Sequence, residues 1–240
     1  MNEIEVSDKK KYLKKSKIIG IGTTAICYLK NDGTVSKIYY DMPGKKDYLQ
    51  KRFNVLSEYS NATFIVPKEL LVDSNNDLIG YNYTYVEGKS LLFTSPFVKL
   101  EDFLNNYEDF LEDCRQFSNS GYVLSDLHGG NIIYKDGKCK IIDLDRGVFY
   151  SDLEYCYRIN TKKFAASYLN KIFKAKLDDI IVFYNHYLQE EYQNTDWTDI
   201  DSVANLFDFI SQCSKKDNPS IHNVRAKHLA YKKINEYYRY

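Results

Sequence analysis

The stretch that decides the fold runs from Leu124 to Arg146 and reads LSDLHGGNIIYKDGKCKIIDLDR. Two apolar, β-favouring runs flank the pair Asp136-Gly137, which is typical of a tight hairpin turn. Such a hairpin places Asp126 and Asn131 on the loop before it and Asp143 where it ends. Two carboxylates and an amide that converge on one point suit a base for a hydroxyl group beside a hydrated Mg²⁺.

The same residue types also serve purely structural roles. Asp and Asn beside glycines are common turn formers, and Asp after a strand often caps a helix. The loop alone therefore leaves a structural and a catalytic interpretation open. The N-terminal half of the chain decides between them.

A D-x-x-x-x-N loop followed by a strand that ends in Asp resembles the catalytic and metal-binding core of the protein-kinase-like superfamily. The resemblance implies that Asp126 orients and partly deprotonates the attacking hydroxyl, while Asn131 and Asp143 hold Mg²⁺ against the phosphates of ATP. The sequence D-L-H-G-G-N is closer to aminoglycoside kinases, choline kinases and atypical bacterial kinases.

Two further residues of this stretch have open roles under the same resemblance. His128 either supports the γ-phosphate or orients Asp126. Asp145 stands where the D-F-G motif of kinases has glycine, and it is either an additional metal ligand or a partner of Arg146.

Composition and charge exclude several classes of protein. The 240 residues carry 33 Lys and Arg against 33 Asp and Glu, which argues against a global attraction to nucleic acid or to an anionic membrane. The five cysteines are scattered, as in a cytosolic protein with reduced thiols. The N-terminus lacks the apolar core of a signal peptide, and no run of about 18 apolar residues occurs. We expect a cytoplasmic protein without nucleic-acid or membrane partners.

A glycine-rich strand–turn–strand near the N-terminus reads GIGTTA from Gly20 onward. Because Gly20 and Gly22 lack Cβ atoms, the backbone amides of this turn, which continues through Thr23 and Thr24, can lie close over phosphates. Ala25 stands in place of a third glycine. No Gly-Lys-Ser/Thr follows, so this is not a Walker-type loop.

The third strand of this half carries Lys37 in the sequence Val35-Ser36-Lys37. It resembles the V-A-I-K strand of kinases, in which the lysine neutralises the α- and β-phosphates. Apolar spacing predicts a helix over 45–59, where kinases place a glutamate that pairs with this lysine. Glu58 is the candidate, although it lies near the end of the helix and Arg52 is closer to the expected position. The pair could therefore also be made differently or be absent.

The segment from Tyr83 to Gly88, YTYVEG, resembles the kinase hinge. The resemblance places Tyr83 in the gatekeeper position. It also implies that the carbonyl of Thr84 and the backbone of Val86 hydrogen-bond the adenine edge. Cys27 and Val35 would form part of the apolar roof above the adenine.

Periodicity predicts that the rest of the chain is mainly helical, with helices over 103–117, 162–173, 177–193, 200–213 and 221–238. Leu124-Ser125-Asp126 replaces the H-R-D sequence of protein kinases, and no A-P-E sequence follows Asp143. We therefore expect no long activation segment and no activation by loop phosphorylation.

Taken in chain order, these features predict an α+β, bilobal protein-kinase-like fold with ATP in the cleft. Residues 1–88 form a small antiparallel β lobe, and residues 89–240 form a helical lobe with the catalytic loop and metal site. The implied function is ATP- and Mg²⁺-dependent phosphate transfer to a protein Ser/Thr hydroxyl, with Asp126, Lys37 and His128 as catalytic residues. A small-molecule kinase of the aminoglycoside or choline type and a nucleotide-binding pseudokinase scaffold are the alternatives.

Overall fold

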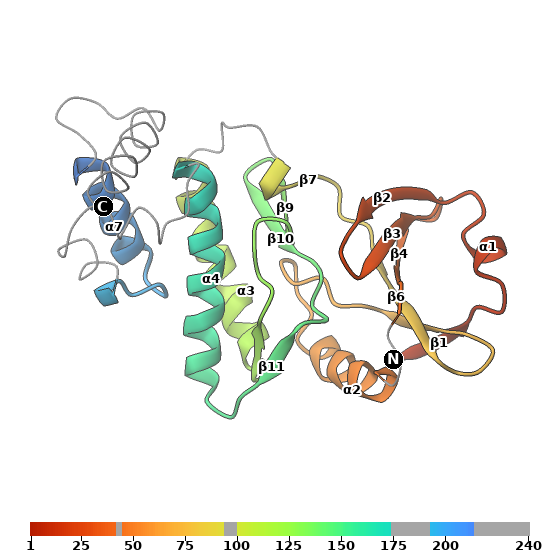
Figure 1. The fold of residues 1–240 in the computed structure, drawn as a ribbon. Coiled ribbons are helices and arrows are strands. Elements are labelled where there is room, and N and C mark those ends of the chain that lie inside the picture. Colours follow the sequence, from red (N-terminus) through yellow and green to blue (C-terminus); the bar gives the residue numbers. More distant parts are fainter. Residues whose placement is uncertain (42–44, 94–99, 174–192, 214–240) are drawn as a thin grey trace, which may run out of the picture.

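A computed structural model describes residues 1–41, 45–93, 100–173 and 193–213 of the chain. Within these ranges, a lobe built on one large sheet is followed by a lobe in which helices pack against short strands (Figure 1). None of the helices in these ranges has the length and apolar character that crossing a membrane requires. The predicted helices over 177–193 and 221–238 lie almost entirely or entirely outside the described residues.

The N-terminal lobe is a six-stranded sheet with the order β1-β5-β6-β4-β3-β2. Its strands are β1 (Asn2–Glu5), β2 (Lys17–Ile21), β3 (Ala25–Leu29), β4 (Thr34–Tyr39), β5 (Glu69–Val72) and β6 (Leu78–Thr84). Neighbouring strands are antiparallel except at one edge, where β1 runs parallel to β5. The sequence did not predict β1, because four residues carry too little alternation to indicate a strand.

Side-chain alternation along β4 determines what the sheet presents on each face. Residues two apart share a face in a strand, so Val35, Lys37 and Tyr39 point the same way, toward the rest of the molecule. Ser36 and Ile38 point to the opposite face. There Ile38 packs in a small apolar cluster with residues of β5, β6 and the segment after β1. Both faces of the sheet are therefore covered, and Lys37 is turned inward.

Helix α2 (Lys46–Ser57) follows β4 in the chain and confirms the helix expected over 45–59. Its predicted apolar face is correct, since Leu49, Phe53 and Leu56 are almost fully buried. Arg52 lies on the same buried side and is only 2% exposed. A buried arginine on an apolar face needs polar partners, which lie in the C-terminal lobe.

The C-terminal lobe combines short strands with long helices. Its elements are β7 (Lys89–Ser90), η1 (Leu91–Phe93), α3 (Leu100–Ser118), β8 (Tyr122–Leu124), β9 (Ile132–Lys135), β10 (Lys138–Ile141), β11 (Gly147–Phe149), α4 (Leu153–Phe173) and α7 (Ile200–Cys213). The hairpin predicted at Asp136-Gly137 is confirmed: β9 and β10 pair antiparallel, and both turn residues have positive φ.

Two helix predictions need adjustment. The helix expected over 103–117 begins earlier, and Tyr107, Phe110, Cys114 and Phe117 are buried along it as their spacing predicted. Helix α4 begins at Leu153 instead of near residue 162, because the Asp152 side chain accepts a hydrogen bond from the Tyr155 amide and caps the helix. The helix over 200–213 is confirmed as α7.

Helix α4 holds β8, the strand that leads into the loop of Asp126. The fully buried Asn160 accepts a hydrogen bond from the Leu124 amide at 3.0 Å and donates one to the Tyr122 carbonyl at 2.8 Å. Lys163 donates to the Leu124 carbonyl. Side-chain amides and ammonium groups thus supply the partners that β8 lacks on this side, so the start of the loop is fixed.

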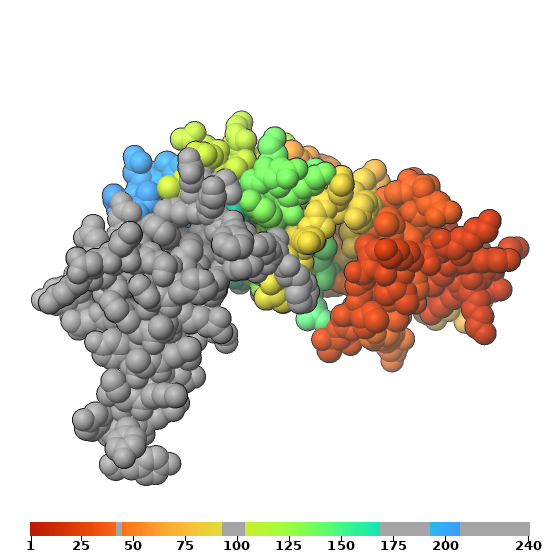
Figure 2. All heavy atoms as spheres, turned by 90° about the horizontal axis from the view of Figure 1, so that it is seen from above, coloured from red at the N-terminus to blue at the C-terminus, as the bar shows by residue number. Residues whose placement is uncertain are grey.

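The two lobes lie one after the other along the longest axis of the described part of the chain. In Figures 1 and 2 the large sheet lies at one end, α7 lies at the other, and the short strands lie between them. Helix α2 lies between the sheet and β11 (Figure 1). This places α2 beside the segment that follows Asp143.

Candidate active site

Strands β8 and β11 bring the two functional loops together. They pair antiparallel, with Leu124 opposite Gly147, and the Ser125 amide donates to the Arg146 carbonyl at 3.1 Å. The chain leaves β8 directly into the loop that holds Asp126. It enters β11 directly from the segment that begins with Asp143. The base predicted on one loop and the carboxylate predicted on the other therefore lie at the same edge of the lobe.

The loop from Asp126 to Asn131, predicted to be catalytic, is held by hydrogen bonds among its own residues. The Asn131 side chain donates to the Asp126 carbonyl at 2.8 Å, and the Asn131 amide donates to the His128 carbonyl at 2.9 Å. His128 Nδ1 accepts from the Gly130 amide, while its Nε2 lies 3.6 Å from the Asp126 carboxylate. His128 is thus turned toward Asp126, the geometry that an orienting role requires.

Lys37 reaches across the cleft from β4 to the segment after β10. Its ammonium group pairs with the carboxylate of Asp143 and lies 2.9 Å from that of Asp145. Tyr81 on β6, directly opposite Lys37 in the sheet, donates to Asp143 at 3.0 Å, and Tyr39 donates to Asp145. One lysine, two carboxylates and two phenols therefore form a single network between the lobes.

Burial and pairing oppose each other in setting the charges of this network. Burial alone would lower the pKa of Lys37, but Asp143 and Asp145 outweigh it and raise that pKa, so the ammonium form persists. Burial raises the pKa of the Asp143 carboxyl, and the neighbouring charge of Asp145 raises it further. Burial likewise opposes ionisation of Asp145, yet Lys37 and Tyr39 outweigh it and hold the pKa of that carboxyl below its usual range.

The structure assigns Arg146 a partner other than Asp145. Its guanidinium lies 3.6 Å from the Asp126 carboxylate and 3.5 Å from the hydroxyl of Thr24 on the glycine turn. Asp145 instead faces Lys37 and Tyr39. The side chains of Asp145 and Arg146 therefore point to opposite sides of the segment, as neighbours in extended chain do.

Glu58 does not pair with Lys37. It is the exposed residue that ends α2, and among the described residues the carboxylates within ion-pair distance of Lys37 are those of Asp143 and Asp145. Arg52 occupies the inward position instead and donates to the backbone carbonyls of Asp145 and Gly147. The prediction of Glu58 as the partner of Lys37 is wrong, because the carboxylates that reach the lysine come from the segment after β10 and not from the helix.

A cleft of about 670 Å³ lies between the lobes, a volume within the range of ligand pockets. The predicted site residues that line it are Gly20, Gly22, Thr23, Thr24, Cys27, Val35, Lys37, Tyr83, Val86, Asp126, His128, Asn131 and Asp143. Three predicted residues, Glu58, Thr84 and Asp145, are not in its lining. The cleft therefore gathers residues from both halves of the predicted site.

The two glycines of the turn are not required by the fold. A Cβ on Gly20 would meet Cys27 at 3.8 Å, and one on Gly22 would meet the Ala25 carbonyl at 3.5 Å, both ordinary contacts. Neither glycine has the positive φ that side chains avoid. Their lack of side chains instead leaves open space at the cleft, which is what close approach of a ligand to the backbone needs.

The hinge-like segment lies beside the same cleft. Tyr83, at the end of β6, is buried, and its hydroxyl lies 3.8 Å from the sulfur of Cys27. Burial raises the pKa of the Cys27 thiol, so it is not an activated nucleophile. Tyr85 and Val86 line the cleft, whereas Thr84 is exposed. The predicted gatekeeper therefore places a buried aromatic side chain in the lining of the cleft.

Comparisons with known proteins give one informative result. No family model and no curated protein sequence matches the chain. Solved structures do match: the chain is similar to an apo pseudokinase, with a TM-score of 0.57 and 14% identity over 95% of this chain and 96% of that one. The chain has a protein-kinase-like fold. Since the identity is so low, the likeness shows the fold alone, which is the bilobal α+β fold that the sequence predicted.

Within this kinase-like cleft, the predicted metal ligands differ in access. No cluster of three or more His, Cys, Asp or Glu side chains in the described ranges could hold a metal ion by itself. Mg²⁺ beside a nucleotide usually takes one or two carboxylates, substrate phosphates and waters, so Asn131 and Asp143 provide a fitting donor set. The Asp143 side chain is 28% exposed, whereas that of Asp145 is 5% exposed beneath Lys37.

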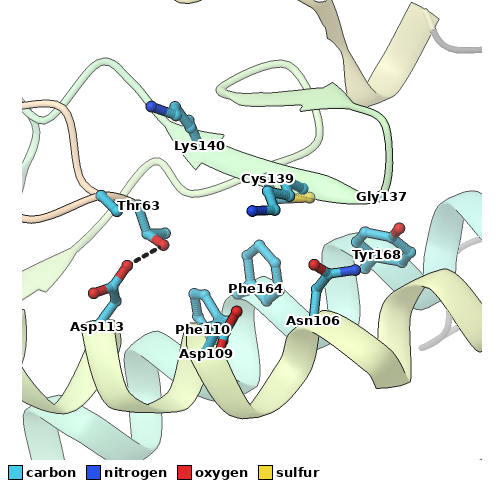
Figure 3. A pocket seen from close by; sticks show the side chains of 12 residues that line it. Thr63, Asn106, Asp109, Phe110, Asp113, Gly137, Cys139, Lys140, Phe164 and Tyr168 are labelled. Carbon is cyan, nitrogen blue, oxygen red and sulfur yellow. Dashed lines mark hydrogen bonds between the residues drawn. The ribbon is translucent and has the colours of Figure 1, made fainter.

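A second, smaller hollow of about 130 Å³ lies between β10 and helices α3 and α4, and it shares no lining residue with the cleft (Figure 3). Phe110 and Phe164 stack on its floor with centroids 3.7 Å apart. Asp113 at one end accepts a hydrogen bond from Thr63. Its volume lies below the roughly 300–1,000 Å³ of ligand pockets, so the nucleotide-sized site is the cleft.

The sequence analysis gave no role to Tyr39 or Tyr81, noted Arg52 only for its position on the helix, and considered Arg146 only as a partner of Asp145. Tyr39 had a readable signal, since it lies two residues after Lys37 and must share its face. Arg52 also had one, because a charged residue interrupts the apolar face of α2. Tyr81 and Arg146 had none, since their roles depend on which strands pair and on how the lobes meet.

Proposed function

We propose that this chain is an ATP- and Mg²⁺-dependent phosphotransferase that acts on a Ser/Thr hydroxyl of a protein, without control by an activation loop. The observation that carries the proposal is the cleft, in which Lys37, Asp126, Asn131 and Asp143 face one space of nucleotide size. Each of these side chains has a distinct task in phosphoryl transfer, and a purely structural loop has no need for all four.

The chemistry assigned to the residues follows from their positions. Lys37 would balance phosphate charge on the N-terminal side of the cleft, and Asn131 and Asp143 would hold Mg²⁺, which supplies charge neutralisation at the phosphates when bound. Asp126 would accept the proton of the attacking hydroxyl, with His128 and Arg146 setting the direction of its carboxylate. The open backbone at Gly20 and Gly22 would approach the phosphates from above.

The absence of activation-loop control is supported by the short path from Asp143 to α4. Strand β11 and helix α4 follow almost immediately, with α4 beginning at Leu153. Strand β11 is held by backbone pairing with β8, and Arg52 donates to its first residue, Gly147. A segment fixed at this many points has no room for a loop that refolds on phosphorylation.

A protein acceptor is favoured by an exposed apolar run on the strand that follows the segment of Asp143. Val148, Phe149 and Tyr150 are 50%, 42% and 43% exposed, and they follow Gly147 directly. Contiguous exposed apolar side chains suit contact with a polypeptide better than contact with a small polar sugar. Because β11 pairs antiparallel with β8, this run begins beside the loop of Asp126 and extends away from it, with Phe149 opposite Tyr122.

A small-molecule acceptor is the second candidate. The D-L-H-G-G-N loop is similar to that of aminoglycoside and choline kinases, and the short segment after Asp143 offers little surface for presenting a peptide. Transfer assays separate the two candidates directly. Labelled phosphate from ATP would be followed onto the chain itself, onto a mixture of generic protein substrates and onto a panel of aminoglycosides and choline, with Asp126→Asn as the inactive control.

A nucleotide-binding scaffold is the remaining alternative, and the similar solved structure is itself a pseudokinase. Thermal unfolding with ATP, with and without Mg²⁺, tests the binding step shared by all three candidates. A ligand at 100 times its Kd adds about 2.7 kcal/mol of stability, which corresponds to roughly 5–10 °C for a chain of this size. A shift that grows with Mg²⁺ supports the phosphotransferase, a Mg²⁺-independent shift favours the scaffold, and no shift contradicts both.

A further inference from the structure

We propose that Asp145 is the positioning residue for Lys37, in the role that other kinase-like proteins give to a glutamate of the helix, and that Arg52 ties α2 to the segment carrying Asp145. The partner of Lys37 on β4 is thereby a carboxylate of the segment after Asp143 and not one of α2. Helix α2 carries a cation, Arg52, instead. The inference rests on the proposed function and extends it to the residues that place the phosphate-binding lysine.

The geometry of Asp145 is that of a lysine partner. Its Oδ2 atom lies 2.9 Å from Lys37 Nζ and also accepts the hydroxyl of Tyr39. The side chain is 5% exposed, and it is not in the lining of the cleft. An ammonium group fixed by a buried carboxylate and flanked by the rings of Tyr39 and Tyr81, at 5.5 and 5.4 Å, has little freedom to turn.

Helix α2 contributes a cation where a carboxylate was expected. Arg52 is buried, and its guanidinium donates to the carbonyls of Asp145 and Gly147, the second at 2.9 Å. The guanidinium carbon also lies 4.2 and 5.0 Å from the ring centroids of Tyr48 and Tyr122. Arg52 thus holds the backbone of the segment, while the side chain of the same segment holds Lys37.

The position of Lys37 is set by a part of the chain that does not need to move. In this arrangement Lys37 depends on the segment after Asp143 and not on a carboxylate that α2 must swing inward. That segment is fixed by Arg52 and by pairing with β8. The lysine is therefore held in place whenever the fold is formed, which agrees with a site that needs no activating switch.

A metal-ligand role for Asp145 makes a different prediction. Its Oδ1 atom has no hydrogen-bond partner among the described residues, but it is screened from solvent, so an ion would have to enter a closed space to reach it. If Asp145 acts through Lys37, its loss weakens nucleotide binding even without Mg²⁺. If it acts through the metal, its loss weakens only the Mg²⁺-dependent part.

The test is a double-mutant cycle of Lys37→Met, Asp145→Asn and the double variant, with Asp143→Asn as the metal-ligand control. Affinity for ATP is measured by titration calorimetry with and without Mg²⁺. We expect Asp145→Asn to lower the Mg²⁺-free affinity by about tenfold, the scale of one charge-assisted contact. In the Lys37→Met background the same substitution should change affinity by less than about twofold. Additive losses, or a loss confined to Mg²⁺, would overturn the inference.

Urea unfolding of the wild type, Lys37→Met, Asp145→Asn and the double variant gives a readout that does not depend on nucleotide. Asp145→Asn leaves Lys37 paired with Asp143 alone, and Lys37→Met leaves both carboxylates without their cation. If Lys37 and Asp145 interact, the loss of stability in the double variant should be smaller than the sum of the two single losses, and additive losses would contradict the pairing. If the wild type binds no ATP while this coupling is found, the proposed function fails and the Lys37–Asp145 pairing stands.

Discussion

Arg52 of α2 donates from Nη2 to the carbonyl oxygen of Gly147 at 2.9 Å, and this contact joins the N-terminal lobe to the strand that follows the segment of Asp143. Gly147 permits β11 to lie close to β8, because a Cβ at this position would clash with the Val123 carbonyl and the Tyr122 ring. Helix, segment and strand therefore meet at one backbone position. The relationship can be tested by changing the arginine.

Arg52→Met should destabilise the protein by about 2–4 kcal/mol, because it leaves two buried carbonyls without donors. Arg52→Lys keeps the charge but loses the fork that reaches both carbonyls, so its loss should be smaller. Urea denaturation of both variants measures the difference. Lys51→Met, at an exposed position on the same helix, is the matched control. If Arg52→Met and the control were equally stable, the contact would not hold the lobes together.

Two glycines of the large sheet should differ in how much stability the protein loses when each is replaced by alanine. A Cβ on Gly80 would clash with the backbone carbonyl of Lys37 on the neighbouring strand, so Gly80→Ala should cost about 1–3 kcal/mol of stability. Gly20→Ala meets only Cys27 at 3.8 Å and should leave stability within about 1 kcal/mol of the wild type.

ATP affinity separates the same two variants again. Gly20→Ala should weaken ATP binding despite its normal stability, because the added methyl group occupies the open side of the cleft. Calorimetric titration of this variant, once its fold is verified by thermal unfolding, provides the measurement. Unchanged ATP affinity in Gly20→Ala would remove the glycine turn from the nucleotide site.

Substitutions of Asp126 and Asp143 should affect different steps, the first turnover and the second nucleotide binding. Asp126→Asn should leave ATP affinity nearly intact and reduce turnover by about 10²–10⁴-fold, the usual contribution of a general base. Asp143→Asn should instead weaken the Mg²⁺-dependent part of ATP binding. Steady-state kinetics and titrations at two Mg²⁺ concentrations measure both effects. Unchanged turnover in Asp126→Asn would remove that residue from the mechanism.

The order of elements in this fold could be predicted from sequence because most of the signals are local. The turn at Asp136-Gly137, the apolar face of α2 and the stripe along α3 each follow from residues close in the chain. Lys37, Asp126, Asn131 and Asp143 were found in the same way, since each lies beside a recognisable turn or strand. Their common cleft is a consequence of that order.

The remaining parts of the site depend on contacts between distant residues. Asp145 and Lys37 are far apart in sequence, and no local pattern indicates that these two side chains meet. Whether Arg146 faces Asp145 or Asp126 is decided by the pairing of β8 with β11. Sequence patterns predict which residues carry charge, whereas tertiary packing decides which charges meet.

Cys27 and Cys139 provide a chemical test of the cleft. Burial raises the pKa of both thiols, that of Cys139 to about 12, so each has less thiolate at pH 7.5 than an ordinary cysteine. Alkylation of both by iodoacetamide should therefore be slow and should still accelerate above pH 9, the usual midpoint of a thiol. Mass spectrometry resolves the two sites.

ATP should protect only one of these thiols. Cys27 lines the cleft, whereas Cys139 lines the separate hollow between β10 and the helices (Figure 3). ATP should slow alkylation of Cys27 and leave the rate at Cys139 unchanged. Equal protection of both thiols would indicate a general stabilisation of the fold, and protection of neither would contradict nucleotide binding in the cleft.

Arg146 lies between the base and the glycine turn, 3.6 Å from the Asp126 carboxylate and 3.5 Å from the Thr24 hydroxyl. Its side chain is 53% exposed, so as a surface ion pair it should contribute less than about 1 kcal/mol to stability. The position matters more for catalysis, because a phosphoryl group transferred from beneath the turn to a hydroxyl held at Asp126 would pass this guanidinium. Arg146→Gln should therefore lower kcat by about 10²-fold, the scale of one lost charge-stabilising donor, with little change in stability.

Arg115→Gln is the matched control, since Arg115 is similarly exposed and pairs with Glu154 away from the cleft. If the two substitutions had the same effect on kcat, Arg146 would be an ordinary surface partner of Asp126.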